Sequence, residues 1–463
     1  MKKKIAEVLQ ITIYIWIGIQ VVLGISWVVC NLGHIPDFQE TGELLTMSTT
    51  LCVDEYTGYL YPLIIRGFHE VSERIHVPAC TMLYLLQLII AYLAYEYFLQ
   101  KVVFYKSRKW AVLRKRIPAY VTFAMTIPPV LQVHMAVLPY SLASSLLLIL
   151  VAKIIGIWQE DYVAKGKDFV VMALLWILSA QICVDYAWIS GVAAVIGSAY
   201  YMWLHKHFCW EMGLTVLVTI FVIGGLNSIL QTPGSMGKIQ RSPEGVLLTR
   251  MVWPKFVQME DFWEESVKTQ YSSQELLSIS TYPEKVIYDF GPHMDSVLGY
   301  KDANRVYRNM IKKTLSIDTK YMLSAMLKDG GAYICPPVTM YLQLQGVGSS
   351  FTGWNYGRMK DFTPRLTAVY VNISLTGWMC LFICSVLLTA ISAFPKEWRP
   401  ENMRKRSTRL LLYCTMVVFM TDLWYMMTSG HMQDYKKVPV ISVLWAIGII
   451  AVLNRTEEKY QLR

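Results

Sequence analysis

Long uncharged apolar segments recur along the chain at lengths that suit a lipid bilayer. Crossing about 30 Å of hydrocarbon takes about 20 apolar residues in a helix. The segments predict seven helices before residue 232 and three after residue 365. They cover residues 8–33, 77–95, 117–152 (two helices), 169–184, 186–204, 212–231, 366–395, 410–429 and 438–454. The pattern therefore predicts an all-α polytopic membrane protein with about ten transmembrane helices.

Prolines and single acidic residues interrupt this pattern. Pro128, Pro129 and Pro139 lie in the middle of residues 117–152, which predicts a helical hairpin. Asp185 separates two apolar segments, and we expect it in a tight turn on the outer side. Asp422 is the one charge inside the three C-terminal helices, and an acid within a membrane is costly enough to mark a candidate functional position.

Residues 232–365 break the apolar pattern. This stretch contains 16 Lys/Arg and 13 Asp/Glu, alternates charged, aromatic and turn-forming residues, and has no window that would span a membrane. It predicts a small α or α+β domain outside the bilayer. The chain is thus expected to consist of residues 1–231, a seven-helix module, residues 232–365, an extracytoplasmic domain, and residues 366–463, three further helices with a cytoplasmic tail.

The distribution of Lys and Arg predicts the orientation of the helices, because basic residues in short loops resist translocation. If the N-terminus is cytoplasmic, the cytoplasmic segments carry 23 Lys/Arg and the opposite short loops carry four. Both termini are therefore expected in the cytoplasm of a multi-pass plasma-membrane protein, from a bacterium. The first outer loop, residues 34–76, and residues 232–365 are expected outside.

Composition supports a lipid partner rather than nucleic acid. The chain is 54% hydrophobic and 16% charged, and its net charge of +10 is explained by the cytoplasmic loops. The nine cysteines form no CxxC pair, so metal and redox sites are not expected. Buried free thiols are favoured over a disulfide among Cys30, Cys52 and Cys80. The basic N-terminus is interpreted as leading into a retained first helix, since no small-residue cleavage site follows.

The first outer loop contains the main candidates for chemistry. Five carboxylates lie within 19 residues: Asp37, Glu40, Glu43, Asp54 and Glu55. A carboxylate held just above a membrane can deprotonate an acceptor hydroxyl or bind a divalent cation. Asp37 follows a proline that stiffens its position. The alternative is a solvated acidic loop.

Basic side chains near this loop are candidates for binding an anion. Arg66 and Arg74 are its only basic residues, and arginine suits a departing phosphate. The alternative is interfacial anchoring, or pairing with Glu70 and Glu73. His134 lies at the tip of the predicted hairpin, where it either faces a reaction cavity or bonds to a helix end.

Short motifs in the first half of the chain resemble a known superfamily. A first helix, a Pro-Asp-Phe-x-Glu segment at 36–40, a Tyr-x-Tyr-Pro segment at 59–62 and a second helix resemble the start of GT-C fold glycosyltransferases. Seven helices before a break also resemble that superfamily's amino-terminal module. The hairpin resembles the segment where many relatives place a second outer acid, but this sequence has Tyr140 there. The resemblance covers roughly residues 5–230.

The resemblance implies an inverting glycosyltransferase. It implies a polyprenyl-phosphate sugar as donor and a cell-envelope lipid, glycan or protein as acceptor. Asp37 would match the superfamily's loop-one acid and act as the general base. Glu40, from the same acidic loop, is the second catalytic candidate. The residues expected to contact the substrate are Glu43, Arg66, Arg74, His134 and Tyr140.

Two questions stay open at this stage. The sequence leaves open whether the enzyme needs a divalent cation, because Tyr140 replaces the second acid of a two-acid site. The alternative functions are a transporter or flippase of lipid-linked glycans, for which charges within several helices are expected, and an envelope glycan polymerase or ligase.

Overall fold

A computed structural model describes the helical bundle and parts of the remaining chain. The described residues are 2–33, 35, 39–51, 53, 58–103, 110–157, 165–205, 210–230, 264–272, 274–275, 291–321, 324, 366, 369–374, 413–414, 416–417 and 420–421. They are mostly helical, and no strand occurs among them. Cys52, Asp422 and most of the predicted C-terminal helices lie outside these residues.

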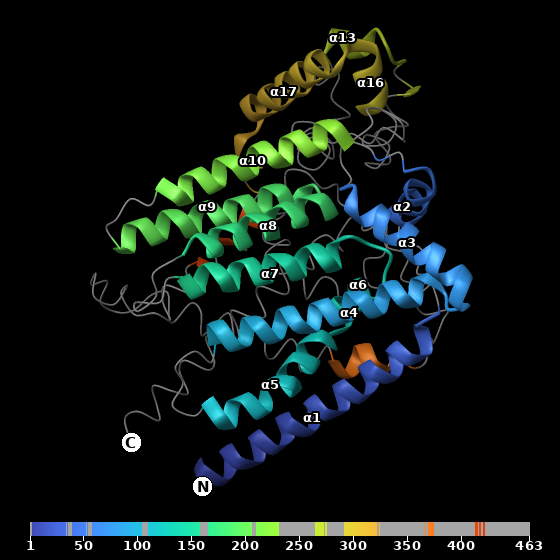
Figure 1. Cartoon of the computed structure of the whole chain (residues 1–463). Helices are drawn as coiled ribbons and strands as arrows, with labels where there is room; N and C mark the ends of the chain where they lie inside the picture. Colours follow the sequence, from blue (N-terminus) through green and yellow to red (C-terminus); the bar gives the residue numbers. More distant parts are fainter. Residues whose placement is uncertain are drawn as a thin grey trace.

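Seven long helices lie side by side with their axes roughly aligned (Figure 1). Each apolar segment predicted before residue 232 forms a helix, so these predictions are confirmed as secondary structure. The helix α7 lies at the centre, in contact with α4, α8 and α9, and most of its side chains are buried. The bounds are α1 (Lys2–Asn31), α4 (Ala79–Phe98), α5 (Trp110–Met125), α7 (Tyr140–Ile157), α8 (Gly166–Ile182), α9 (Asp185–His205) and α10 (Trp210–Leu230).

Four helices of the described chain are long and apolar enough to cross a membrane. Their spans are Tyr14–Asn31, Ala79–Lys101, Tyr140–Ile157 and Trp210–Ile229. The first and last belong to α1 and α10, which expose large apolar side chains such as Ile15 (59%), Phe221 (79%) and Ile229 (80%). Hydrocarbon is the solvent that makes such exposure favourable. A lipid bilayer is therefore the environment that this bundle fits.

Prolines end one helix and start the next in the predicted hairpin. The helix α5 ends at Met125, and α6 (Pro128–His134) begins with its two prolines in the first turn. A proline lacks the amide hydrogen that a helix interior needs, but the first turn leaves its amides unpaired in any case. The hairpin is thus α5, a short α6 and α7.

The turn predicted at Asp185 is also present. Only Cys183 and Val184 separate α8 from α9, and the Tyr186 amide donates to the Cys183 carbonyl oxygen at 3.0 Å. Asp185 is the first residue of α9. An acidic side chain there suits the partial positive charge of a helix N-terminus.

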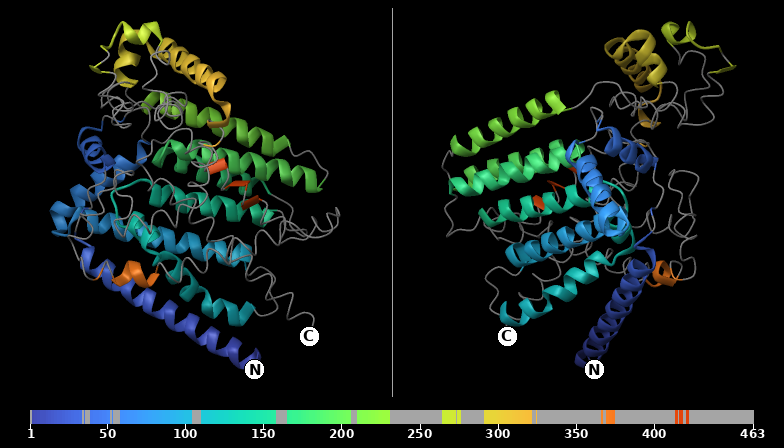
Figure 2. Two further views of the ribbon diagram at one scale, coloured as in Figure 1. Left: turned by 180° about the vertical axis from the view of Figure 1, so that it is seen from behind. Right: turned by 45° about the vertical axis from the view of Figure 1, so that its right-hand side comes forward.

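The segment predicted as the first outer loop, residues 34–76, is largely helical where the structure describes it. It forms α2 (Gln39–Thr50) and α3 (Leu60–Ile75), which pack against each other. Both lie at the end of the bundle where α1 finishes and α4 begins, as Figure 2 shows from two sides. Because α3 also contacts α8, the loop reaches across the bundle end.

Part of the segment between α10 and the C-terminal region forms a separate helical cluster. It contains α13 (Glu265–Lys268), α16 (Gly291–Leu298) and α17 (Tyr300–Ile317). The helices α16 and α17 pack together. In the views of Figures 1 and 2 the cluster lies beyond α10, at the edge of the molecule.

Residues from the C-terminal third are buried among the N-terminal helices. The Tyr370 hydroxyl donates to the Thr126 carbonyl oxygen, and its ring lies 6.5 Å from that of Trp27. The Tyr413 hydroxyl donates to the Ala193 carbonyl oxygen at 2.8 Å. Both tyrosines are at most 4% exposed, so residues on the two sides of 232–365 share one hydrophobic core.

Candidate functional site

The residues just before the predicted first loop, Leu32 and Gly33, are attached to the beginning of α4. The Thr81 hydroxyl donates to the Leu32 carbonyl oxygen at 2.8 Å, and Cys80 Sγ lies 3.9 Å from the Gly33 carbonyl oxygen. Cys80 is a free, buried thiol, and Cys30 is a free, exposed one. The chain therefore leaves α1 at a position set by α4.

A buried glutamine joins three elements beneath the loop. Gln87 of α4 accepts a hydrogen bond from the Tyr61 hydroxyl of α3 at 3.1 Å. Its amide nitrogen donates to the carbonyl oxygens of His134 at 2.9 Å and Ala136 at 3.0 Å. Gln87 and Tyr61 are both fully buried. Since an unpaired buried polar group is costly, these bonds hold α3 and the end of α6 in register with α4.

His134 ends α6 as a buried side chain. It is 1% exposed, and its Nδ1 lies 2.7 Å from the Ser141 hydroxyl. Its Nε2 has no hydrogen-bond partner in the part of the chain that is described. The predicted alternative of a histidine bonded near a helix end matches this contact with the first turn of α7. Because Nε2 is buried as well, the ring is packed among the helices and is not exposed to a substrate.

A close backbone approach brings the loop onto α8. A Cβ atom added to Gly58, just before α3, would lie 2.2 Å from the carbonyl oxygen of Gln181. Only glycine allows this approach. Gln181 in turn donates to the Asn227 side-chain oxygen at 2.9 Å, which links α8 to α10 at the same end of the bundle.

The structure separates the other predicted residues. Arg66 pairs with Glu70 one turn later on α3, with 3.3 Å between Nε and Oε1, and both side chains are largely exposed. Arg74 is exposed in the last turn of α3. Glu43 is half-buried on α2, and Tyr140 is buried as the first residue of α7.

The catalytic candidates of residues 34–76 fall largely outside the described part of the chain. Asp37 lies outside the described residues, as do Asp54 and Glu55, and of Glu40 only the helical backbone in α2 is described. In the described part of the chain, no group of three or more His, Cys, Asp or Glu side chains is placed to hold a metal ion. The described part of the loop therefore shows how the loop is attached to α4 and α8.

Sequence reasoning missed the residues that form these anchors. Tyr61 belongs to the Tyr-x-Tyr-Pro segment, but its partner Gln87 was not singled out. The available signal was a lone amide side chain in the apolar segment 77–95. Ser141 follows Tyr140 directly and gave no comparable signal.

An ion pair lies at the opposite end of the bundle. Lys153 Nζ of α7 is 2.6 Å from Asp168 Oδ1 of α8, and the Asp168 side chain is 1% exposed. Asp168 Oδ2 also accepts from the Lys165 amide at 3.0 Å, which caps α8. The pair joins the end of α7 to the start of α8 and is remote in the fold from α2 and α3.

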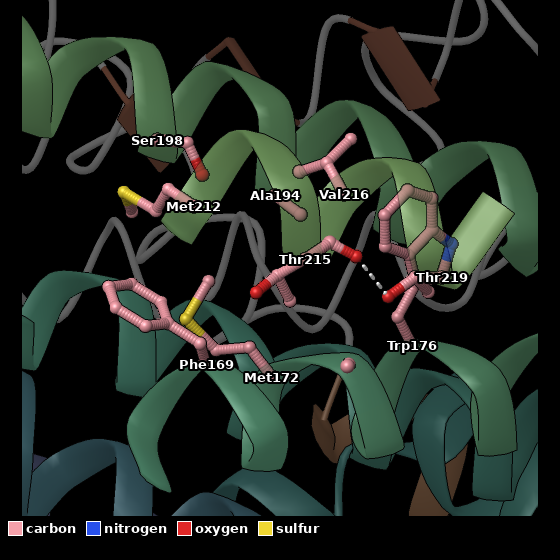
Figure 3. A pocket seen from close by; sticks show the side chains of 10 residues that line it. Phe169, Met172, Trp176, Ala194, Ser198, Met212, Thr215, Val216 and Thr219 are labelled. Carbon is pink, nitrogen blue, oxygen red and sulfur yellow. Dashed lines mark hydrogen bonds between the residues drawn. The ribbon is translucent and has the colours of Figure 1, made fainter. Parts of the chain in front are cut away.

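A small pocket lies between α8, α9 and α10 (Figure 3). It is narrow and partly open to the surface, and its lining includes Phe169, Met172, Trp176 and Ser198. Thr219 beside it uses its hydroxyl on the Thr215 carbonyl oxygen at 2.7 Å. Such a lining offers contact to hydrocarbon rather than to a sugar.

Comparison with known proteins adds no relative to this geometry. No protein-family model, no curated protein and no solved structure matches the chain. The functional argument therefore depends on the residues themselves.

Proposed function

We propose that this protein is a membrane glycosyltransferase that moves a sugar from a polyprenyl-phosphate carrier to a cell-envelope acceptor. In this proposal about ten helices cross the plasma membrane, both termini are cytoplasmic, and α2 and α3 lie on the outer face. The observation that supports it is the anchoring of the acidic first loop across one end of the bundle, through the Tyr61–Gln87 bond and the close approach at Gly58.

This anchoring limits where the proposed base can be. Asp37 is four residues after Gly33 and two before Gln39. A chain extends at most about 3.6 Å per residue, so the Asp37 Cα lies within about 14 Å of Gly33 and about 7 Å of Gln39. General-base catalysis requires a carboxylate held near the acceptor, and the attachment of the segments on either side of Asp37 supports this role in the proposal.

The proposed reaction is a displacement at the anomeric carbon. Asp37 takes the proton of the acceptor hydroxyl, the acceptor oxygen bonds to that carbon, and the carbon–oxygen bond to phosphate breaks. Polyprenyl phosphate leaves with the bonding electrons. Arg66 and Arg74 of α3 would neutralise its charge.

Sugar transfer by the purified protein in liposomes tests the proposal. The reaction is offered a panel of radiolabelled polyprenyl-phosphate sugars, with Asp37→Asn as the test variant and Glu73→Gln as a control that also removes one loop carboxylate. Transfer or donor hydrolysis by the wild type and by Glu73→Gln, but not by Asp37→Asn, is expected. Intact donor crossing the bilayer would instead identify a flippase, and full activity of Asp37→Asn would remove Asp37 as the base.

A further inference from the structure

The helix α3 carries one continuous row of apolar side chains along its length. The row consists of Leu60, Ile64, Phe68, Val71 and Ile75. At about 100° per residue, these positions fall within an arc of about 80° around the helix axis. Spacings of four and three residues are those of an amphipathic helix that buries one side. We call these five residues the apolar row.

The two halves of the apolar row have different surroundings. Leu60, Ile64 and Phe68 pack partly against the hydrophobic core of the bundle. Val71 is 43% exposed and Ile75 is 52% exposed. In the described chain, the bundle therefore covers only the first three members of the row. Water is an unfavourable environment for the other two, because exposed apolar surface costs free energy there.

Charged side chains of α3 lie on the opposite side of the helix. Arg66, His69, Glu70 and Glu73 are centred roughly 180° from the centre of the apolar row. His69, Glu70 and Glu73 are exposed, and Arg66 pairs with Glu70. A helix divided in this way suits a lipid interface, where its charged side faces water and its apolar side lies among the acyl chains.

The ends of α3 lie at one boundary of the membrane-spanning bundle. The Thr81 hydroxyl donates to the Leu32 carbonyl oxygen, so the apolar span of α1 ends at the level where that of α4 begins. Only residues 76–78 separate α3 from α4. At the other end of α3, Gly58 approaches the Gln181 carbonyl oxygen in the last turn of α8. The helix therefore runs obliquely across the end of the bundle, as Figures 1 and 2 show.

Lipid is the partner that the surroundings of α3 favour. Val29 near the end of α1, Leu85 near the start of α4 and Trp188 in the first turn of α9 are all exposed. Apolar side chains and tryptophan in such places are typical of a bundle surrounded by hydrocarbon up to this level. A stable contact with a second copy needs about 800 Å² per partner, and two exposed side chains do not supply it.

We infer that α3 is an interfacial helix and that its apolar row, from Phe68 onward, inserts into the lipid leaflet at this end of the bundle. In the proposed orientation of the chain, this is the outer leaflet. The inference goes beyond the transferase proposal, because insertion needs neither a sugar donor nor a base.

Spin labels on α3 test the insertion. The full chain, with all nine native cysteines replaced by serine, is placed in phosphatidylcholine nanodiscs and labelled at one new cysteine at a time. Val71→Cys and Ile75→Cys are the test variants, and His69→Cys and Glu73→Cys are the controls on the charged side. Ile89→Cys, at an exposed apolar position of α4, gives the value for hydrocarbon. The measurement compares collisions of each label with oxygen, which concentrates in lipid, and with a water-soluble nickel chelate.

The ratio of oxygen to chelate collisions should be several-fold higher at positions 71 and 75 than at 69 and 73, and should approach the ratio at 89. Equal ratios at the four positions of α3 would overturn the inference, because the apolar row would then be in water. Few collisions with either reagent at 71 and 75, together with dipolar broadening between labels, would overturn it in favour of a second copy.

Photolabelling of the native chain tests the same insertion without cysteine variants. A phosphatidylcholine with a diazirine in its acyl chain is activated in the nanodisc, and the adducts are mapped by mass spectrometry. Adducts are expected at Val71 and Ile75 and on the exposed side of α4, but not at His69 or Glu73. Labelling of α4 without labelling of residues 68–75 would contradict the inference.

Discussion

Gln87 and His134 are joined through the histidine's backbone, since the Gln87 amide donates to the His134 carbonyl oxygen at 2.9 Å. The imidazole is left to Ser141, whose hydroxyl lies 2.7 Å from Nδ1. The position of the ring and its hydrogen bond are thus set by two different helices, α4 and α7. Substituting Gln87 should therefore affect the backbone position of His134, and substituting Ser141 should affect the hydrogen bond of its ring.

Replacing Gln87 with leucine should destabilise the bundle and release α3. The Tyr61 hydroxyl and the carbonyl oxygens of His134 and Ala136 would lose the bonds they make with Gln87. We expect the free energy of unfolding to fall by roughly 3–9 kcal/mol, because three buried groups are left unsatisfied and each costs about 1–3 kcal/mol. Thermal unfolding followed by tryptophan fluorescence measures the loss. Gln100→Leu is the control and should cost less, because it removes only a bond from the π-helical turn Leu99–Val103 to Glu96 of α4. Equal losses would contradict the role of Gln87.

Substituting Gly58 with alanine should impair the docking of the first loop. The new Cβ would lie 2.2 Å from the Gln181 carbonyl oxygen, so the backbone must shift. The expected result is a loss of sugar transfer, together with faster proteolysis within residues 34–76. Gly67→Ala is the matched control, since a Cβ at this position within α3 meets nothing within 4 Å. There alanine should stabilise the helix by about 0.5–1 kcal/mol, and two variants that behave alike would argue against the close approach.

Asp168→Asn should weaken the junction of α7 and α8. The substitution removes the charge that faces Lys153 at 2.6 Å while retaining an oxygen that can cap α8. Breaking a buried pair on one side costs roughly 3–5 kcal/mol, and the half-exposed lysine should reduce this value. Denaturation of the purified protein tests the loss. Adding Lys153→Met should restore part of it, because no uncompensated charge then remains; a double variant weaker than Asp168→Asn would contradict this account.

Chemical labelling tests the proposed orientation of the helices. Glu70 is exposed on α3, and Lys165 is exposed at the opposite end of the bundle. In a background in which all nine native cysteines are replaced by serine, a cysteine at position 70 should react with a membrane-impermeant maleimide on intact cells. A cysteine at position 165 should react only after the membrane is opened. The reverse pattern would invert the proposed topology.

The sequence predicted elements better than it predicted contacts. The prolines at 128 and 129 and the acid at 185 marked helix boundaries, because their effects on a helix are local. The first outer loop was expected as an acidic loop, although most of its described part is helical. Its helices depend on packing against α4 and α8, and such tertiary contacts leave little trace in a single sequence. Gln87 illustrates this point. Its stabilising effect comes from hydrogen bonds with Tyr61 and with two carbonyl oxygens, and these groups come close to it only in the folded chain.

The burial of Tyr370 and Tyr413 also has a consequence for biosynthesis. The Thr126 carbonyl oxygen accepts from a residue 244 positions later, and the Ala193 carbonyl oxygen from one 220 positions later. At a synthesis rate of about 5–20 residues per second, each acceptor waits roughly 10–50 s for its donor. When the ribosome has just completed α10, the interior of the bundle therefore still lacks Tyr370 and Tyr413. Any factor that assists membrane insertion at that time binds a bundle without these two side chains.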